Sequence, residues 1–226
     1  MPGQATETAS RPYKGLPMEG LIATWYARNT RRDLRGYRKC ADAVAARLAP
    51  GARVLEVAAG PGYLAVEIAR RGPFRVGGLD ISETFVRLAR AHAREEGVTV
   101  DFQHGNASRM PYANESFDYV VCRAAFKNFT DPLGALDEMH RVLAPGGEAA
   151  VYDLRKEATG AEIDAEVAGM GLSRLDALLT RWIFRATLLK NAYGEPAIEG
   201  LARQSRFGGG TLRRDGIGFE LRLVKR

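Results

Sequence analysis

The feature of this sequence that most constrains the fold is a short apolar strand that leads directly into a glycine turn and a helix. The stretch is Val-Leu-Glu-Val-Ala-Ala-Gly-Pro-Gly-Tyr-Leu, residues 54–64. Glycine has no Cβ and tolerates positive φ, so a ligand can approach the backbone closely at Gly60 and Gly62. Taken alone, the spacing Gly60-x-Gly62-x-x-Ala65 also fits a dinucleotide-binding fingerprint. The turn therefore predicts a ligand site at the end of a strand without identifying the ligand.

Strands and helices alternate through the first two thirds of the chain. Strands are predicted over 53–58, 74–80, 98–104, 117–122 and 148–153. Apolar residues at helical spacing predict a helix over 17–48, and Ser82 and Asp131-Pro132 are typical starts of two further helices. This alternation predicts parallel strands joined by right-handed crossovers, with a layer of helices on each face.

The last third breaks this alternation. Apolar residues at three- and four-residue spacing predict one amphipathic helix over 172–190. Another helix is expected from Gly194 to Gln204. Two closing strands follow, near 211–213 and over 218–224.

Composition places the chain among ordinary globular proteins. Its 226 residues suit a single domain, and 46% hydrophobic and 27% charged residues are near the averages. No apolar run approaches the roughly 20 residues that cross a bilayer, and the first ten residues lack the basic and apolar blocks of a signal peptide. We therefore expect no membrane span and a cytoplasmic location.

Cysteine usage and charge exclude other classes. Cys40 and Cys122 have no histidine at metal-ligand spacing, so neither a disulfide framework nor a metal site is predicted. The net charge of +6 is scattered along the chain, without a basic motif interleaved with aromatic residues. A nucleic-acid partner is therefore not favoured.

Five ordered blocks between Val54 and Asp153 resemble class I S-adenosylmethionine-dependent methyltransferases of the ubiquinone and menaquinone biosynthesis type. The blocks are residues 54–64, 77–81, 105–112, 116–121 and 141–147. The resemblance implies a Rossmann-like α/β sheet of about seven strands, mostly parallel with a closing antiparallel strand, and helices on both faces. It also implies S-adenosyl-L-methionine as cofactor, S-adenosyl-L-homocysteine as product, and methylation of an O, N or C atom of a small, hydrophobic or aromatic acceptor.

The resemblance assigns roles to individual residues. Glu56 is the acidic residue that precedes the glycine turn, and Asp80 would accept hydrogen bonds from both ribose hydroxyls. Asn106 stands where most relatives have an aspartate that contacts the adenine amino group, and Ala58 replaces a common glycine. Tyr26 would lie near the methionine end. The predicted cofactor-binding set is Tyr26, Glu56, Ala58, Gly60, Gly62, Asp80, Ile81, Asn106, Ala107 and Arg123.

Structural alternatives remain open for three of these side chains. Glu56 would otherwise be an ordinary carboxylate at a sheet edge, although an acid inside Val-Leu-Glu-Val is costly to bury without a partner. Asp80 would otherwise cap the helix that begins at Ser82, and Asn106 would be a turn residue.

The acceptor side is less well defined by the sequence. The candidate substrate residues are Trp25, Phe126, Lys127, Asn128 and Trp182, and Lys127 is equally consistent with a solvated loop charge. No catalytic base is identified. Positioning alone can account for about 7–11 kcal/mol of such a barrier, so an acceptor that is already nucleophilic needs none.

Two other classes of function match part of the sequence. Tyr152 and Lys156 have the Tyr-x-x-x-Lys spacing of nicotinamide-dependent reductases, but the tyrosine falls on a predicted strand. A non-catalytic nucleotide- or RNA-binding module is the second alternative, although residues 122–126 lack the Asn/Asp-Pro-Pro-aromatic block of nucleic-acid methyltransferases.

We expect one structural domain with four parts. They are an N-terminal leader and lid helices over 1–50, a cofactor-binding core over 51–155, a helical lid insertion over 156–204, and closing strands over 205–226. Residues 15–38 and 172–190 would form the lid over the acceptor, because they carry both tryptophans and lie outside the five blocks. Packing against the sheet, or a homodimer interface, would explain the same apolar stripe.

Overall fold

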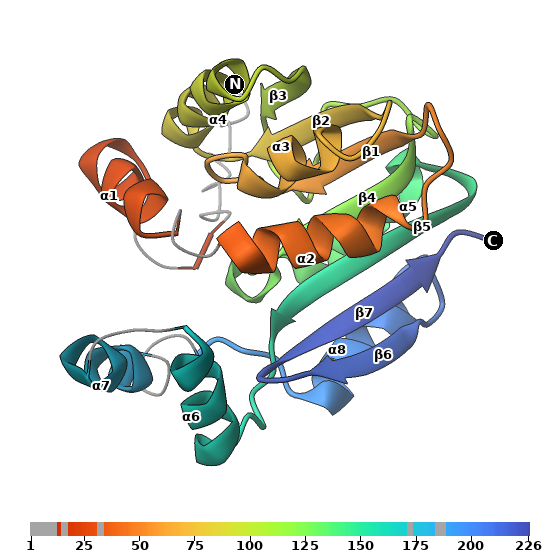
Figure 1. Cartoon of the computed structure of the whole chain (residues 1–226). Coiled ribbons are helices and arrows are strands. Elements are labelled where there is room, and N and C mark those ends of the chain that lie inside the picture. Colours follow the sequence, from red (N-terminus) through yellow and green to blue (C-terminus); the bar gives the residue numbers. More distant parts are fainter. Residues whose placement is uncertain (1–12, 15–17, 31–33, 171–173, 184–188) are drawn as a thin grey trace, which may run out of the picture.

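A seven-stranded sheet forms the centre of the computed structural model, which describes the chain except for residues 1–12, 15–17, 31–33, 171–173 and 184–188 (Figure 1). The strands are β1 (Arg53–Val57), β2 (Arg75–Asp80), β3 (Val100–His104), β4 (Phe117–Arg123), β5 (Leu143–Leu154), β6 (Thr211–Asp215) and β7 (Gly218–Val224). Their order is β3-β2-β1-β4-β5-β7-β6. β1 to β5 pair in parallel, whereas β7 is antiparallel to both β5 and β6. The predicted fold class is confirmed.

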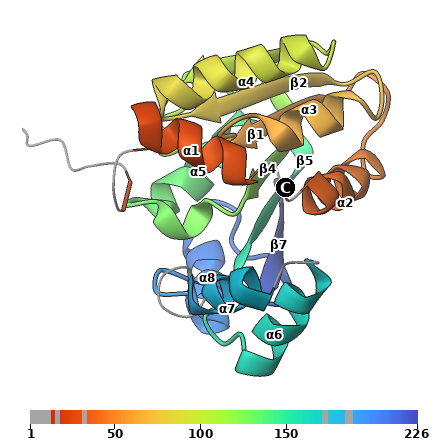
Figure 2. The same ribbon diagram turned by 60° about the vertical axis from the view of Figure 1, so that its left-hand side comes forward.

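Helices cover both faces of this sheet, and others lie beside the carboxyl ends of its strands (Figures 1 and 2). They are α1 (Gly20–Thr30), α2 (Leu34–Ala45), α3 (Tyr63–Ala69), α4 (Glu83–Glu95), α5 (Pro132–Val142), α6 (Gly160–Gly169), α7 (Arg174–Ile183) and α8 (Glu195–Gln204), with a short 3-10 turn, η2 (Phe126–Asn128). One apolar core joins α2, α3 and α4 to one face, and a second joins α5 and α8 to the other. Side chains alternate between the two faces of β1, so this strand contributes to both cores. Leu55 and Val57 face α5, whereas Val54 faces α3.

Local sequence explains where these helices begin. Ser82 Oγ accepts a hydrogen bond from Phe85 N at the start of α4, and Asp131 accepts one from Gly134 N at the start of α5. Both predicted caps are confirmed. At the start of α3, Gly62 has a φ of +79°, and a Cβ there would lie 2.6 Å from the ring of Phe102. This position therefore requires glycine.

Four elements differ from the sequence-based expectation. The helix predicted over 17–48 is two helices, α1 and α2, within the described residues. Of the helix predicted over 172–190, the described residues contain α7 and a turn at 189–190. Helix α6 was missed, although Thr159 and Glu162 form a capping box at its start. β5 begins at Leu143, because residues 146 and 147 pair with the backbone of Lys225 instead of forming a free turn.

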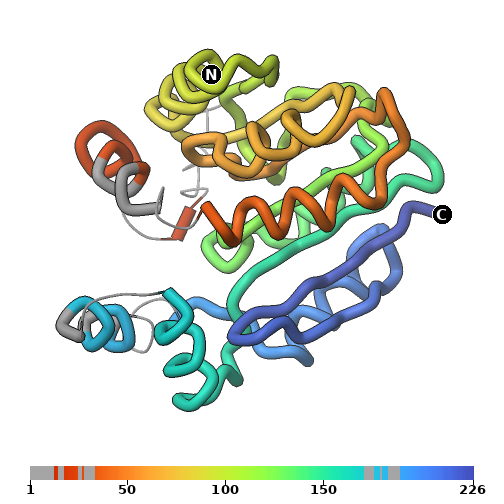
Figure 3. Tube along the Cα trace, viewed as in Figure 1, coloured from red at the N-terminus to blue at the C-terminus, as the bar shows by residue number. Residues whose placement is uncertain are grey.

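The strand order places the ligand-binding edge of the sheet. Connections run outward from β1 to β3 on one side and from β4 to β5 on the other, so the order reverses between β1 and β4. A crevice outside the carboxyl ends of the strands at such a reversal is the usual ligand site in this kind of sheet. Figures 2 and 3 show α1, α6 and α7 on that side of the molecule. Within the described residues, none of the helices has the length and apolar character needed to cross a bilayer.

Candidate active site

A cavity of about 370 Å³ lies at the carboxyl ends of β1, β2 and β4. Its size falls in the range of about 300–1,000 Å³ that is common for small-molecule sites. Eight of the ten predicted cofactor-binding residues line it: Glu56, Ala58, Gly60, Asp80, Ile81, Asn106, Ala107 and Arg123. Gly62 lies just behind the turn as the N-cap of α3. Tyr26 belongs to α1, but its side chain lies outside the described part of the structure.

The glycine turn folds tightly over the end of β1. Ala58 and Gly60 have φ values of +58° and +54°, which lie in the left-handed region. Ala59 N donates to Leu79 O at 3.0 Å, and this bond ties the turn to the end of β2. The turn therefore presents backbone to the cavity, as its sequence predicts. Alanine at position 58 carries the strain of a left-handed residue with a Cβ.

Asp80 braces this turn from the end of β2. Its Oδ2 accepts from Gly60 N at 2.7 Å, and its Oδ1 accepts from Ser82 N at 2.9 Å. Burial raises the pKa of this carboxyl, although the two backbone bonds oppose that shift. The capping bond of α4 comes from Ser82, so Asp80 is not simply its cap. Each carboxylate oxygen retains a second lone pair, so Asp80 still has the acceptor capacity that the predicted ribose contacts need.

Glu56 is buried on the α3 side of the central strand β1, so the structural alternative of an ordinary carboxylate at a sheet edge does not hold. Its Oε2 accepts from Ala65 N in the first turn of α3 at 2.8 Å. Burial raises its pKa to about 8, while that bond and the positive charge of Arg123 pull the pKa down. Glu56 thus changes its charge easily near neutral pH when a cation enters the cavity.

Arg123 ends β4 beside the glycine turn, since Val57 and Cys122 are register partners. Its guanidinium carbon lies 4.4 Å from the centre of the Tyr37 ring, within the range of a cation–π interaction. Both side chains line the cavity. A positive group and the Glu56 carboxyl therefore share one end of the site.

Asn106 is a turn residue in this structure. Its Oδ1 accepts hydrogen bonds from Ser108 N and Ser108 Oγ, each at 3.0 Å. This arrangement favours the structural alternative for Asn106, and its adenine contact stays a prediction. Ile81 is 37% exposed at the mouth of the same cavity and, with Ala107, offers an apolar surface for a flat ring.

The predicted substrate residues are only partly brought together. Asn128 lines the cavity, whereas Phe126 is fully buried in the core and Lys127 is buried against Asp153. Placing Phe126 and Lys127 in the cavity wall was wrong, because η2 turns these two side chains inward. Trp182 is 62% exposed on α7 and does not line the cavity, and the side chain of Trp25 lies outside the described residues.

Among the lining residues that sequence reasoning missed are five with large side chains. They are Tyr13, Met18, Glu19, Tyr37 and Phe129. Lys14 N donates to Asn128 O at 2.8 Å, and Glu19 accepts from Thr84 N at 3.2 Å, so the N-terminal segment is attached at both ends of the cavity. These contacts span more than 60 residues of sequence, and no motif in residues 13–19 indicates them.

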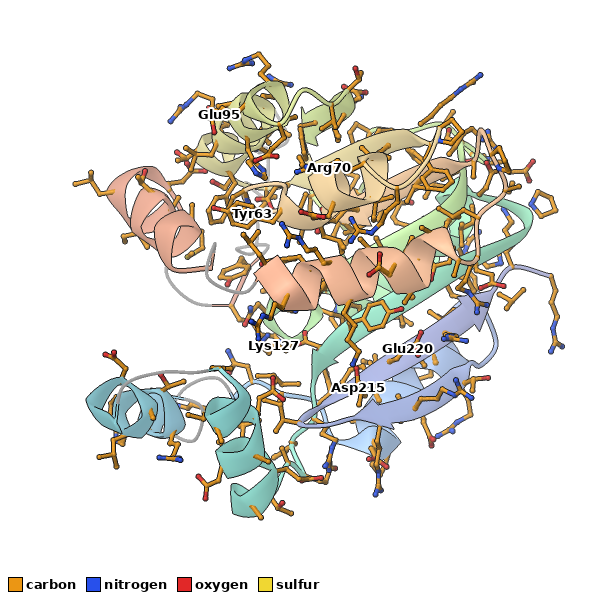
Figure 4. All side chains as sticks on the ribbon, in the orientation of Figure 1. Tyr63, Arg70, Glu95, Lys127, Asp215 and Glu220 are labelled. Atoms are coloured by element: carbon orange, nitrogen blue, oxygen red, sulfur yellow. The ribbon has the colours of Figure 1, made fainter. Side chains whose placement is uncertain are left out.

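The reductase alternative does not fit this geometry. Tyr152 lies on β5, and its hydroxyl donates to Glu220 Oε1 at 2.9 Å. Figure 4 places Glu220 on β7, away from the α1 and α4 side of the cavity. Lys156 is exposed, and neither residue of the Tyr-x-x-x-Lys pair lines the cavity. The spacing is accidental.

Comparison with known sequences identifies the central segment. Residues 54–147 match a family described as "Methyltransferase domain". The chain is 39% identical over 127 residues to the demethylmenaquinone methyltransferase of Deinococcus radiodurans, covering 56% of this chain and 52% of that protein. It is 37% identical over 130 residues to the enzyme of the same name from Thermus thermophilus, covering 57% and 58%. The chain thus spans about half the length of these relatives.

Solved structures extend the comparison to the fold. A SAM-dependent methyltransferase from Aquifex aeolicus aligns with a TM-score of 0.61 at 18% identity, over 79% of this chain and 85% of that one. The [4+2]-cyclase SpnF aligns with a TM-score of 0.56 at 22% identity, over 83% and 80%. At such identities the likeness shows the fold alone. The sequence match is more specific: residues 54–147 match a methyltransferase domain, and the predicted resemblance to class I methyltransferases, whose cofactor is S-adenosylmethionine, is confirmed.

Proposed function

We propose that this protein transfers the methyl group of S-adenosylmethionine to a small aromatic acceptor of the quinol type. The single observation that carries the proposal is the cavity at the reversal of strand order, where the Glu56, Asp80 and Arg123 side chains meet beside a glycine turn. The names of the curated relatives supply the acceptor class, since both act on demethylmenaquinone. A reductase or a nucleic-acid-binding module finds no support in these features.

The charges of the cavity suit this cofactor. Glu19, Glu56 and Asp80 bring three carboxyls to one cavity, and Arg123 is its single Arg or Lys side chain among the described residues. Bound S-adenosylmethionine supplies an electrophilic methyl group on a positively charged sulfonium. The carboxyls favour a ligand that carries positive charge, and Arg123 favours a carboxylate near Glu56. Asp80 would hold the vicinal diol of the ribose.

The acceptor end of the cavity is apolar and aromatic. Tyr13, Tyr37 and Phe129 line it together with Met18 and the two alanines that follow β4. Such a wall can orient a flat ring by stacking and exclude water during the transfer. Glu19 is the one carboxylate among the described lining residues that is not assigned to the cofactor, and it accepts a hydrogen bond from Thr84 N beside α4. The protein's contribution is therefore mainly alignment and desolvation, which suits an acceptor that is itself a strong nucleophile.

The test uses S-adenosylmethionine labelled in its methyl group. We expect label to appear in a chemically reduced 1,4-naphthoquinol that carries a short prenyl chain, and S-adenosylhomocysteine to raise the melting temperature. NADH and NADPH should leave the melting temperature unchanged. Stabilisation by a nicotinamide nucleotide alone would overturn the methyltransferase assignment. Cofactor binding with label in other compounds of a small-molecule extract would overturn only the acceptor class.

A further inference from the structure

A buried ion pair lies behind the cavity wall formed by residues 124–129. Lys127 Nζ is 2.7 Å from Asp153 Oδ1, and the two side chains are 7% and 0% exposed. Figure 4 places Lys127 below the left-hand end of α2, and the residue is buried. Removing two charges from water offsets most of their attraction, so a buried pair is a weak source of stability. Stability alone therefore does not account for it.

The pair is bonded to the backbone of the wall and to the end of β5. Lys127 Nζ also donates to Ala124 O at 2.9 Å, and Lys127 N donates to Asp153 Oδ2 at 2.8 Å. Leu154 N donates to Asp153 Oδ1 at 2.7 Å, which fixes the carboxylate on its own strand. Ala124 N donates to Tyr152 O at 2.7 Å. Ala124 and Lys127 of the wall are therefore both hydrogen-bonded to residues at the carboxyl end of β5.

These bonds determine which side chains reach the cavity. Ala124, Ala125, Asn128 and Phe129 line it, while Phe126 and Lys127 are turned inward. Ala124 has a φ of +59°, a strained conformation for a residue with a Cβ, and Lys127 Nζ holds its carbonyl. Loss of the ammonium would free that carbonyl and allow the wall to relax toward or away from the cavity.

We propose that the Lys127–Asp153 pair positions the 124–129 wall against the acceptor and so sets acceptor affinity without touching the acceptor. The inference rests on the proposed function, because it assigns this end of the cavity to the acceptor. Lys127 and Asp153 act here as positioning residues. The role is separate from cofactor binding, since the glycine turn and Asp80 are braced by their own hydrogen bonds.

Lys127→Met tests the pair, because methionine keeps much of the length and removes the charge. We expect the KM for the short-chain naphthoquinol to rise about tenfold, with the Kd for S-adenosylhomocysteine within about twofold of wild type. Lys127→Arg should restore most of the loss, since a guanidinium can donate to the same oxygens. Hydrogen exchange of the 124–129 amides should become faster in Lys127→Met.

Arg71→Met is the matched control. Arg71 and Glu67 form an ion pair at 2.6 Å with side chains 17% and 9% exposed, at the end of α3 and away from the cavity. This variant should lower the melting temperature and leave acceptor KM and the exchange of residues 124–129 unchanged.

Two results would overturn the inference, and each is distinct from failure of the proposed function. If Lys127→Met lowers the melting temperature like Arg71→Met but leaves KM and 124–129 exchange at wild-type values, the pair is only structural. If the wild-type protein binds the cofactor but neither binds nor methylates the naphthoquinol, the proposed acceptor class is wrong. Hydrogen exchange of residues 124–129 then still tests whether the ion pair positions the wall. Faster exchange at 124–129 in Lys127→Met alone supports it, and equal exchange in both variants refutes it.

Discussion

The two ends of the cavity are built in different ways. The cofactor end comes from three short stretches that each follow a strand, around Glu56, Asp80 and Asn106, and neighbouring backbone amides satisfy their side chains. The proposed acceptor end combines Tyr13 and Met18, Tyr37 on α2 and the residues of the 124–129 wall that line the cavity, which meet only after folding. Local motifs therefore define the first end, and long-range packing defines the second. Substitutions at one end should therefore change binding of the cofactor, and substitutions at the other end binding of the acceptor.

Asp80→Ala should have the largest effect, because it removes both the brace of the glycine turn and the proposed acceptor for two ribose hydroxyls. We expect the affinity for S-adenosylmethionine to fall by roughly 10- to 100-fold, measured by calorimetry. Acceptor KM at saturating cofactor should change little. Asp131→Ala is the control, since it removes an aspartate that caps α5 outside the cavity. If a folded Asp80→Ala protein binds S-adenosylmethionine with wild-type affinity, Asp80 only holds the glycine turn and does not contact the ribose.

Glu56→Gln should have the next largest effect, and the effect should depend on pH. The cationic cofactor favours ionised Glu56, whose pKa is raised by burial from 4.5 to about 8. Wild-type affinity should therefore increase as pH rises toward 8 and level off above it, with proton release on binding below that pH. Glu56→Gln should bind about tenfold more weakly at pH 8 and lose this dependence. Because Glu56→Gln lacks this carboxyl, any pH dependence of affinity that remains in the variant reports titration of the ligand itself.

Stability of the ligand-free protein should follow the opposite trend. Between pH 4.5 and about 8 the folded protein holds a proton on Glu56 that the unfolded chain releases. The free energy of unfolding contributed by this group therefore falls as pH rises through that window. Glu56→Gln should remove the slope and melt at a higher temperature than wild type at pH 8. A steeper slope in the variant would contradict the burial argument.

The division between the two ends also explains what the sequence could predict. The strand, glycine turn and helix at 54–64 are specified by neighbouring residues, as are the caps Ser82 and Asp131, and all were identified correctly. Lys127 was misplaced because a three-residue turn decides whether a side chain faces the cavity or the core. Glu19 and Tyr37 were missed because nothing local marks a side chain whose partners lie far away in the sequence.

Trp182→Ala tests the lid proposed for 172–190 and should have a smaller effect. Trp182 and Leu178 are each 62% exposed on α7, one turn apart, and neither lines the cavity. A lid that closes over the acceptor would bury them, so the variant should raise acceptor KM by roughly three- to fivefold and leave cofactor affinity unchanged. Trp25→Ala is the companion change on α1. A change in oligomeric state with intact acceptor kinetics would instead indicate an interface between copies.

Ala58→Gly should have the smallest effect and refines the description of the cofactor end. Ala58 has a φ of +58°, and relief of a left-handed residue with a Cβ is worth roughly 1–2 kcal/mol. The greater freedom of glycine in the unfolded chain takes back about 0.4–1 kcal/mol. The net gain of about 0.5–1 kcal/mol should raise the melting temperature by about 1–4 °C.

Ala59→Gly is the matched control, because the buried Ala59 is not among the residues with positive φ and should lose stability. Cofactor affinity should stay near wild type in Ala58→Gly, since the backbone is already held in place by the Ala59–Leu79 and Gly60–Asp80 bonds. A large loss of affinity would instead show that the alanine methyl itself contacts the ligand.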